Sequence, residues 1–209
     1  RVIITGRKKE LIVLASGNSG KLRELAAILT PLGHELIAQS ALGIETPPET
    51  GVTFTENALL KARYAARVAR LPALADDSGI EVDALGGKPG VYSARYAGEH
   101  ATDRENLDKL LAALQGRARE QRSARYRCVI ALVRSADDAE PLLAEGAWEG
   151  LVLASPRGTG GFGYDPVFQP RGLDVTAAEL SPEDKNRLSH RGQALRALAR
   201  ELQQRKLFT

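Results

Sequence analysis

An apolar segment, a glycine-containing turn and an amphipathic segment follow one another near the start of the chain. Residues 11–15, LIVLA, predict a buried strand. The helix predicted after the turn has an apolar face at the i, i+3, i+4, i+7 spacing, made of Leu22, Leu25, Ala26 and Leu29. Ser19 is typical of a helix cap, and Pro31 with Gly33 predicts the helix end. A strand that runs through a turn into a helix indicates an α/β fold and leaves backbone N–H groups at the turn, where anions bind.

The turn itself matches part of the phosphate-binding loop pattern G-x-x-x-x-G-K-[ST]. Gly20 and Lys21 fit this pattern, whereas Ala15 stands at the first glycine position. Leu22 replaces the hydroxyl residue that would hold Mg²⁺. We therefore expect phosphate to bind here and a metal ion to be held by residues elsewhere in the chain.

Predicted helices and strands alternate along the rest of the chain. Capping boxes at Thr53 with Glu56 and at Thr102 with Glu105 begin two helices, the first with a small-residue face made of Ala58, Ala62, Ala65, Ala66 and Ala69. Strands are predicted at residues 72–75, at residues 125–134 and around residues 148–153, and two helices close the chain, after Ser181 and from Ser189. This alternation favours an α/β fold with a largely central sheet.

The composition is that of one globular domain or of two lobes that share a sheet, with 43% hydrophobic and 26% charged residues in 209. No run of about 18 apolar residues occurs, so no membrane-spanning helix is expected. Cys128 is the only cysteine and lies in an apolar run, which favours a core position and a reducing, cytoplasmic compartment.

The net charge of +3 suits an anionic ligand such as a nucleotide or a nucleic acid. The arginine-rich run at residues 117–127 is interpreted as a solvated face and a strand edge, so no stable nucleic-acid partner is expected. Residues 158–163, GTGGFG, match a dinucleotide-binding pattern but are followed by Tyr164, Asp165 and Pro166 rather than by a helix. No Rossmann site is therefore predicted.

Two consecutive acids, Asp76 and Asp77, follow the predicted strand at residues 72–75. Strand ends are where α/β proteins assemble their sites, although an aspartate that caps a turn is the simpler alternative. A phosphate loop without its hydroxyl needs a carboxylate for the metal, so Asp77 and Glu49 are the candidate Mg²⁺ ligands. His190 and Arg191 lie in the first turn of the last predicted helix, where cations oppose the helix dipole and a ligand with oxygen acceptors is expected.

Five segments together resemble the inosine triphosphate pyrophosphatase family: SGNSGKLREL, ETGVTFTENALLKA, ADDSGIEVDALGGKPGVYSARYAG, GTGGFGYDPVF and KNRLSHRGQAL. The resemblance implies an elongated central mixed β-sheet flanked by helices, in two lobes with the active-site cleft between them. It also implies a homodimer that requires Mg²⁺ and hydrolyses deaminated purine nucleoside triphosphates (ITP, dITP, XTP) to monophosphate and pyrophosphate. Residues 11–209 would form a single catalytic domain, and residues 1–10 an extension or a cloning remnant.

The resemblance further implies residue roles. Lys21, Lys61 and Asp77 would be catalytic, with Asp77 as proton acceptor, while Asp77 and Glu49 would hold the metal. The substrate would be bound at its triphosphate by Ser16, Gly17, Asn18, Ser19, Gly20 and Lys21, and elsewhere by Ser78, Phe162, Gly163, Tyr164, Asp165, Lys185, His190 and Arg191. Phe162 would stack on the base. Ala15 stands where relatives often have threonine.

Base selection follows from hydrogen-bonding chemistry. Hypoxanthine accepts at O6 and donates at N1–H, the reverse of adenine at both positions. Donors from Lys185, His190 or Arg191 and an acceptor from Asp165 would therefore favour hypoxanthine and xanthine, whereas the exclusion of guanine is not visible in the sequence. The alternatives are a pyrophosphatase for other nucleotides and a nucleotide-binding module without turnover.

Overall fold

The computed structural model describes residues 10–16 and 19–205. Its centre is a six-stranded mixed sheet in the order β2-β1-β3-β4-β5-β6. The strands are β1 (Glu10–Leu14), β2 (His34–Ala38), β3 (Ala73–Val82), β4 (Ser123–Val133), β5 (Leu142–Val152) and β6 (Phe168–Pro170). β1 pairs in parallel with β2 and β3, and the strands from β3 to β6 pair antiparallel. The predicted α/β class with a mixed sheet is confirmed.

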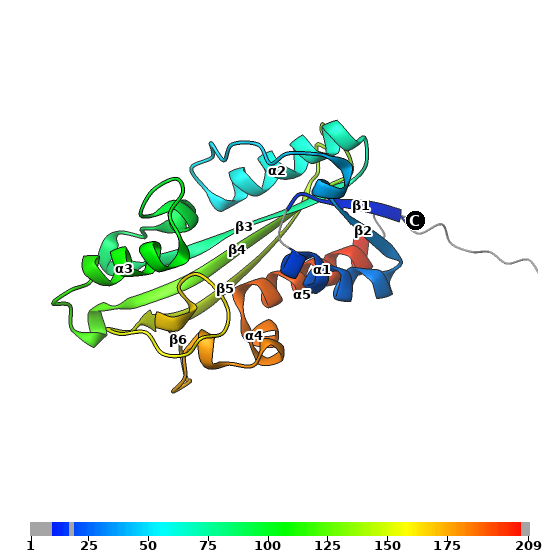
Figure 1. Ribbon diagram of the computed structural model, residues 1–209. Helices are drawn as coiled ribbons and strands as arrows, with labels where there is room; N and C mark the ends of the chain where they lie inside the picture. Colours follow the sequence, from blue (N-terminus) through cyan, green and yellow to red (C-terminus); the bar gives the residue numbers. More distant parts are fainter. Residues whose placement is uncertain (1–9, 17–18, 206–209) are drawn as a thin grey trace, which may run out of the picture.

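Helices cover both faces of this sheet (Figure 1). α2 (Phe54–Ala69) lies on one face, and α1 (Ser19–Leu29) and α5 (His190–Arg205) lie on the other. α3 (Asp103–Ala113) lies at the far end of the long strands from β1 and β2, and α4 (Pro182–Leu188) precedes α5 (Figure 1). The sheet is therefore elongated, with one group of helices near each end.

Successive residues of a strand point to opposite faces, and the core follows this rule. Ala73 and Ala75 of β3 pack with the alanine face of α2, whereas Leu74 packs with α1 and α5. Cys128 is fully buried, as predicted, and burial raises the pKa of its thiol to about 12. A thiol that stays protonated is not a nucleophile at neutral pH.

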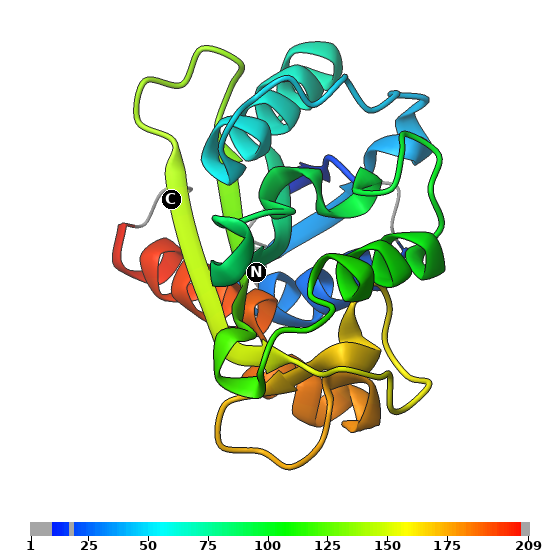
Figure 2. The same cartoon turned by 90° about the vertical axis from the view of Figure 1, so that its left-hand side faces the viewer.

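Both predicted capping boxes are present. Thr53 accepts from the backbone N–H of Glu56 at 3.1 Å, and Thr102 accepts from that of Glu105 at 3.2 Å. α1 begins at Ser19, and the capping interaction that the sequence predicts for Ser19 falls outside what the structure describes. The hairpin between β4 and β5 lies beside α2 (Figure 2), where Arg63 donates to the main-chain oxygens of Ala136 and Asp138.

β3 is longer than the sequence predicts. The strand was expected at residues 72–75, with Asp76 and Asp77 at its end, but it continues to Val82 because β4 pairs with it along its whole length. β1 pairs with β3 through Ala73 and Leu74 and then ends. Asp76 and Asp77 therefore lie inside a strand, and the expectation that they follow a strand end is wrong for β3. It holds for β1, whose carboxyl end lies just before them.

The arginine-rich run is not at a strand edge, because β4 lies between β3 and β5. Arg122 is buried and donates to three main-chain oxygens, so it is not part of a solvated face. Arg125 forms ion pairs with Asp83 and Glu149 of the neighbouring segments. The interpretation as a solvated face holds for Arg117 and Arg119, which are exposed, but not for Arg122. Among the described residues, no helix has the length and apolar character needed to cross a membrane.

α5 comes very close to β5 at Gly146. A Cβ atom at this position would lie 2.0 Å from the main-chain oxygen of His190, so a larger residue would push the helix away. Gly146 pairs with the core residue Cys128 of β4. This contact sets the first turn of α5, with His190 and Arg191, against the middle of the sheet.

Candidate active site

A cavity of about 270 Å³ brings together segments that lie far apart in the sequence. The predicted residues that line it are Lys21, Glu49, Lys61, Asp77, Ser78, Phe162, Gly163, Tyr164, Asp165, Lys185, His190 and Arg191. The three remote regions that the sequence singled out, α1, β3 and the loop at residues 158–163, therefore meet at one place.

The remaining predicted residues belong to the turn after β1. Ser16 directly follows β1, and Ser19 and Gly20 are the first residues of α1. Ser16 is not among the described residues that line the cavity. Gly17 and Asn18 lie outside the described residues. The position of Lys21 one turn into α1 brings this segment to the rim of the cavity.

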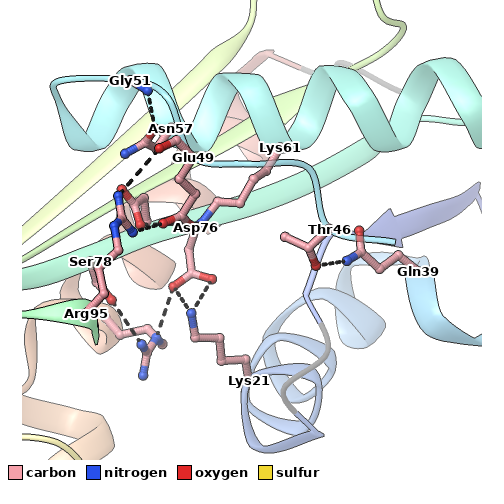
Figure 3. Close-up of polar contacts among 12 residues, drawn as sticks. Lys21, Gln39, Thr46, Glu49, Gly51, Asn57, Lys61, Asp76, Ser78 and Arg95 are labelled. Carbon is pink, nitrogen blue, oxygen red and sulfur yellow. Dashed lines mark hydrogen bonds and ion pairs between the residues drawn. The ribbon is translucent and has the colours of Figure 1, made fainter. Parts of the chain in front are cut away.

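Asp76 is the centre of a group of cations on the α1 and α5 face of the sheet (Figure 3). Lys21 donates to both of its carboxylate oxygens, at 2.8 and 2.9 Å, and Arg191 lies 3.6 Å from one of them. Arg191 also donates to the hydroxyl of Ser78 at 3.4 Å. Burial by itself would raise the pKa of Asp76, but Lys21, Arg191 and Lys61 hold it well below its usual range. Asp76 is thus a permanent counter-ion.

Lys61 of α2 lies between two carboxylates (Figure 3). Its ammonium is 2.6 Å from Oε1 of Glu49 and 3.4 Å from Oδ1 of Asp77. Arg95 holds the other oxygen of Glu49 at 3.0 Å. Burial alone would lower the pKa of Lys61, but Asp77, Asp76 and Glu49 raise it, so the ammonium stays charged. One cation therefore already bridges the two predicted metal ligands.

The neighbouring acids Asp76 and Asp77 differ in basicity. Burial, reinforced by the charge of Glu49, raises the pKa of Asp77 in spite of Lys61. The pKa of Asp76 is lowered by its cations. Two carboxyl groups with diverging pKa values serve different purposes in an active site, and the more basic one is suited to accept a proton.

The predicted ligands Glu49 and Asp77 offer a partial metal site. Among the described residues, no group of three or more His, Cys, Asp or Glu side chains could hold a metal ion. Oδ2 of Asp77 is buried, and none of the described residues forms a hydrogen bond to it. Two carboxylates with a spare buried oxygen suit Mg²⁺, which is commonly held by one or two carboxylates together with substrate phosphates and water.

Asp165 organises the opposite end of the cavity. Its Oδ1 accepts from the hydroxyl of Tyr126 at 3.1 Å. Its Oδ2 accepts from the backbone N–H of Phe162 at 2.9 Å and from Lys185. A Cβ atom at Gly161 would lie 2.0 Å from Oδ2, so glycine lets the loop close around this carboxylate. The glycine-rich motif therefore wraps around the carboxylate of Asp165.

The rest of this loop is tied to neighbouring elements. The backbone N–H of Gly163 donates to Asp103 at 2.7 Å, and the hydroxyl of Tyr164 donates to the main-chain oxygen of Ser93 at 2.7 Å. Phe162 remains 51% exposed at the mouth of the cavity. The ammonium of Lys185 lies 4.4 Å from the centre of its ring. The ring is thus held by a cation but presents enough surface for a stacked base.

His190 is a neutral, buried imidazole. Its ring stacks on that of Tyr126, with centroids 4.7 Å apart and an interplanar angle of 8°. Burial, together with Arg191 and Lys185, holds the pKa of His190 well below its ordinary value. Its Nδ1 is buried and has no hydrogen-bond partner among the residues described. A neutral ring with one unused nitrogen is available to a ligand in the cavity.

Several residues in or beside the cavity are absent from the sequence-based set, among them Tyr126, Arg95 and Asn57. Tyr126 and Arg95 contact predicted residues, but neither stands in a pattern that indicates it. Asn57 is fully buried on α2 and accepts from the backbone N–H of Gly51 at 2.8 Å. Asn57 and Lys61 are spaced i, i+4 beside the alanine face of α2, and this spacing is the signal that identifies Asn57.

Comparisons with known proteins agree with this geometry. Residues 12–201 match the model of the Ham1 family. The dITP/XTP pyrophosphatase of Methylococcus capsulatus is 60% identical over 191 residues, which cover 91% of this chain and 95% of that protein. The dITP/XTP pyrophosphatase of Escherichia coli K12 is 54% identical over 187 residues, 90% of this chain and 95% of that one. The solved structure of a HAM1 protein from Coxiella burnetii has a TM-score of 0.89 at 49% identity, covering 93% of this chain and 99% of that chain.

The buried neutral state of His190 predicts a pH dependence of stability. The folded pKa is below the unfolded value, so below about pH 6.5 the unfolded state takes up a proton that the folded state does not. As the pH decreases below about 6.5, the free energy of unfolding should decrease by up to about 1.4 kcal/mol per pH unit because of His190. His190→Gln should remove this contribution to the pH dependence. Urea unfolding at pH 7.5 and 5.0 measures it. Burial also lowers the pKa of His34, which is present in both the wild type and the His190→Gln variant. If the two proteins lost the same free energy of unfolding between pH 7.5 and 5.0, the prediction would be contradicted.

Proposed function

Because the chain belongs to the Ham1 family, we propose that it hydrolyses deaminated purine nucleoside triphosphates, ITP, dITP and XTP, to the monophosphate and pyrophosphate. The observation that carries this proposal is the arrangement of one cavity. Lysines and a carboxylate pair lie at one end, and a hydrogen-bonding slot around Asp165 with an aromatic ring lies at the other. A purine triphosphate has matching ends.

The proposed reaction is attack of water on the α phosphorus. A bond forms between the water oxygen and phosphorus, the bond to the α–β bridging oxygen breaks, and pyrophosphate leaves. Asp77 accepts the proton of the attacking water, because it is the more basic acid of the pair on β3. Lys21 and Lys61 stabilise the charge on the phosphates, and each is already held in place by a carboxylate.

Mg²⁺ is the proposed cofactor. Glu49 and Asp77 would hold it, and Oδ2 of Asp77 is buried without a hydrogen-bond partner among the described residues. When bound, Mg²⁺ would orient water and neutralise the phosphate oxygens. The sequence-based expectation that the metal is held away from the turn after β1 fits this placement, since neither ligand belongs to that turn.

Base recognition is proposed to use the slot around Asp165. Oδ1 of Asp165 would accept N1–H, Lys185 and Arg191 would donate to O6, and Phe162 would stack on the ring. Adenine has a lone pair at N1 and an amino group at position 6, so it would leave these groups unpaired. Sites of this kind reject the wrong ligand by about 10⁴ to 10⁵.

We also propose that residues 11–209 act as one catalytic domain in the cytoplasm, where it removes such nucleotides from the pool. The alternatives are a pyrophosphatase for other nucleotides and a binding module without turnover. No feature of the described residues favours either of them. A basic Asp77 beside two fixed lysines favours catalysis over binding alone.

A homodimer is proposed from the surface next to the site. A wider groove of about 860 Å³, separate from the catalytic acids, is lined by Val52, Phe54, Tyr92 and Tyr96. Val52 is 75% exposed and Tyr92 is 53% exposed. The adjacent strand face carries charges of both signs in ion pairs, among them Arg127 with Glu81 and Glu145. A face with both signs is self-complementary, as a two-fold interface requires.

The function is tested by incubation with ITP, dITP, XTP, ATP, GTP and dUTP, with and without Mg²⁺, and by identification of the products. Monophosphate and pyrophosphate should form from the deaminated purines, and only with the metal present. Diphosphate with inorganic phosphate would exclude attack at the α phosphorus. Equal rates on ATP and ITP would exclude the proposed base recognition.

Asp77→Asn should abolish turnover of ITP while the protein remains folded. Loss of a general base costs about 10² to 10⁴ in rate, and loss of a metal ligand adds to this. Steady-state kinetics and circular dichroism are the measurements, with Asp108→Asn on the exposed face of α3 as the control. A variant at position 77 that keeps wild-type kinetics would rule out Asp77 as the essential acid.

Sedimentation velocity tests the dimer. The apparent mass of the wild type should be twice the chain mass of 22.5 kDa. Tyr92→Glu places a charge in the groove and should yield monomers, whereas Tyr64→Glu on the partly exposed side of α2 should not. A monomeric wild type, or a dimer unaffected by Tyr92→Glu, would refute the proposed interface.

A further inference from the structure

Tyr126 connects two residues at the base end of the cavity. Its hydroxyl donates to Oδ1 of Asp165, and its ring lies parallel to the imidazole of His190. Tyr126 is 7% exposed and itself lines the cavity. One side chain therefore contacts both the acid and the imidazole that face the ligand.

The sheet holds Tyr126 in a single position. It pairs directly with Trp148 across β4 and β5, so the two rings share one face of the sheet. The ring of Phe168 meets that of Tyr126 edge-on at 4.6 Å and that of Trp148 at 5.5 Å. His190 lies over the same pair, with its ring centroid 6.5 Å from that of Trp148. These aromatic contacts fix the ring of Tyr126 and therefore the position of its hydroxyl.

The hydroxyl of Tyr126 is directed at the oxygen of Asp165 that has room for a ligand. Oδ2 already accepts from Phe162 and Lys185. Oδ1 accepts from Tyr126, and a carboxylate oxygen takes about two hydrogen bonds, so one further donor fits there. Burial and the charge of Asp165 raise the pKa of Tyr126 well above its ordinary value, so it remains a donor at all physiological pH values.

We propose that Tyr126 is a positioning residue for base selection, which orients Oδ1 of Asp165 toward N1–H of the purine and fixes the plane of His190. The inference rests on the proposed function and concerns how the base is chosen. Tyr126 does not touch the reacting phosphates, so its contribution depends on which base is bound.

Tyr126→Phe removes the hydroxyl and keeps the ring, so it is the informative variant. The measurement is kcat/KM for ITP and for purine riboside triphosphate, which lacks both O6 and N1–H. The variant should lose about tenfold or more on ITP, as expected for a hydrogen bond to a charged group, and little on the second substrate. An equal loss on both substrates, or none on either, would overturn the proposal.

A double variant tests the route of the effect. If Tyr126 acts through Asp165, the variant with both Tyr126→Phe and Asp165→Asn should lose no more on ITP than Asp165→Asn alone. Additive losses would show that Tyr126 acts independently and would overturn the proposal. Tyr64→Phe on α2 is the matched control, and melting temperatures establish that each variant is folded.

These outcomes are distinct from failure of the proposed function. A wild-type protein without ITP hydrolysis would refute the function itself before any variant is compared. A wild type that hydrolyses ITP, with a Tyr126→Phe variant of unchanged selectivity, would refute only the role of Tyr126.

Discussion

The site depends on how β3 is paired. β4 pairs with all of β3, whereas β1 ends beside Leu74, so beyond that point one edge of β3 meets loops and side chains instead of a strand. Successive residues alternate between faces, which sends Asp76 toward Lys21 and Arg191 and Asp77 toward Lys61. The cavity is lined by side chains from both faces, among them Lys21 of α1 and Lys61 of α2. Two adjacent acids can therefore have opposite pKa shifts.

Burying this many charges in one cavity costs free energy unless each charge is paired with an opposite one. Most of the buried acids have such a partner. Asp76 and Asp165 are almost fully buried, and each is held by a lysine. Asp77 has the weakest pairing, since its contact with Lys61 is 3.4 Å long and one oxygen has no hydrogen-bond partner among the described residues. The least satisfied group is the one proposed to take part in the chemistry, as expected where activity requires a destabilised residue.

Much of the fold and most of the site could be predicted from the sequence, because local signals agreed with the final structure. The capping boxes at Thr53 and Thr102 and the alanine face of α2 identified α2 and α3. The chemistry of the residues pointed to Lys21 and Asp77, whereas most of the other cavity-lining residues followed only from the family resemblance. The full length of β3 could not be predicted. Asp76 and Asp77 disfavour a strand, and the lysines that stabilise them come from other elements. Tyr126 was missed since its role depends on cross-strand register with Trp148. β6 has three residues, too few for a periodic signal, and β2 (HELIA) has neither the apolar run of β1 nor a clear alternation.

The close approach of α5 to Gly146 makes the two ends of the cavity differ in how they are held in place. At the base end, α5 packs directly against the main chain of β5 at Gly146, and β5 pairs with β4 along its length. At the other end, Glu49 belongs to a segment between β2 and α2 that is anchored by side chains, including Arg95 and Lys61. A base bound at the proposed slot would therefore meet a preorganised surface, which lowers the entropic cost of ordering side chains there.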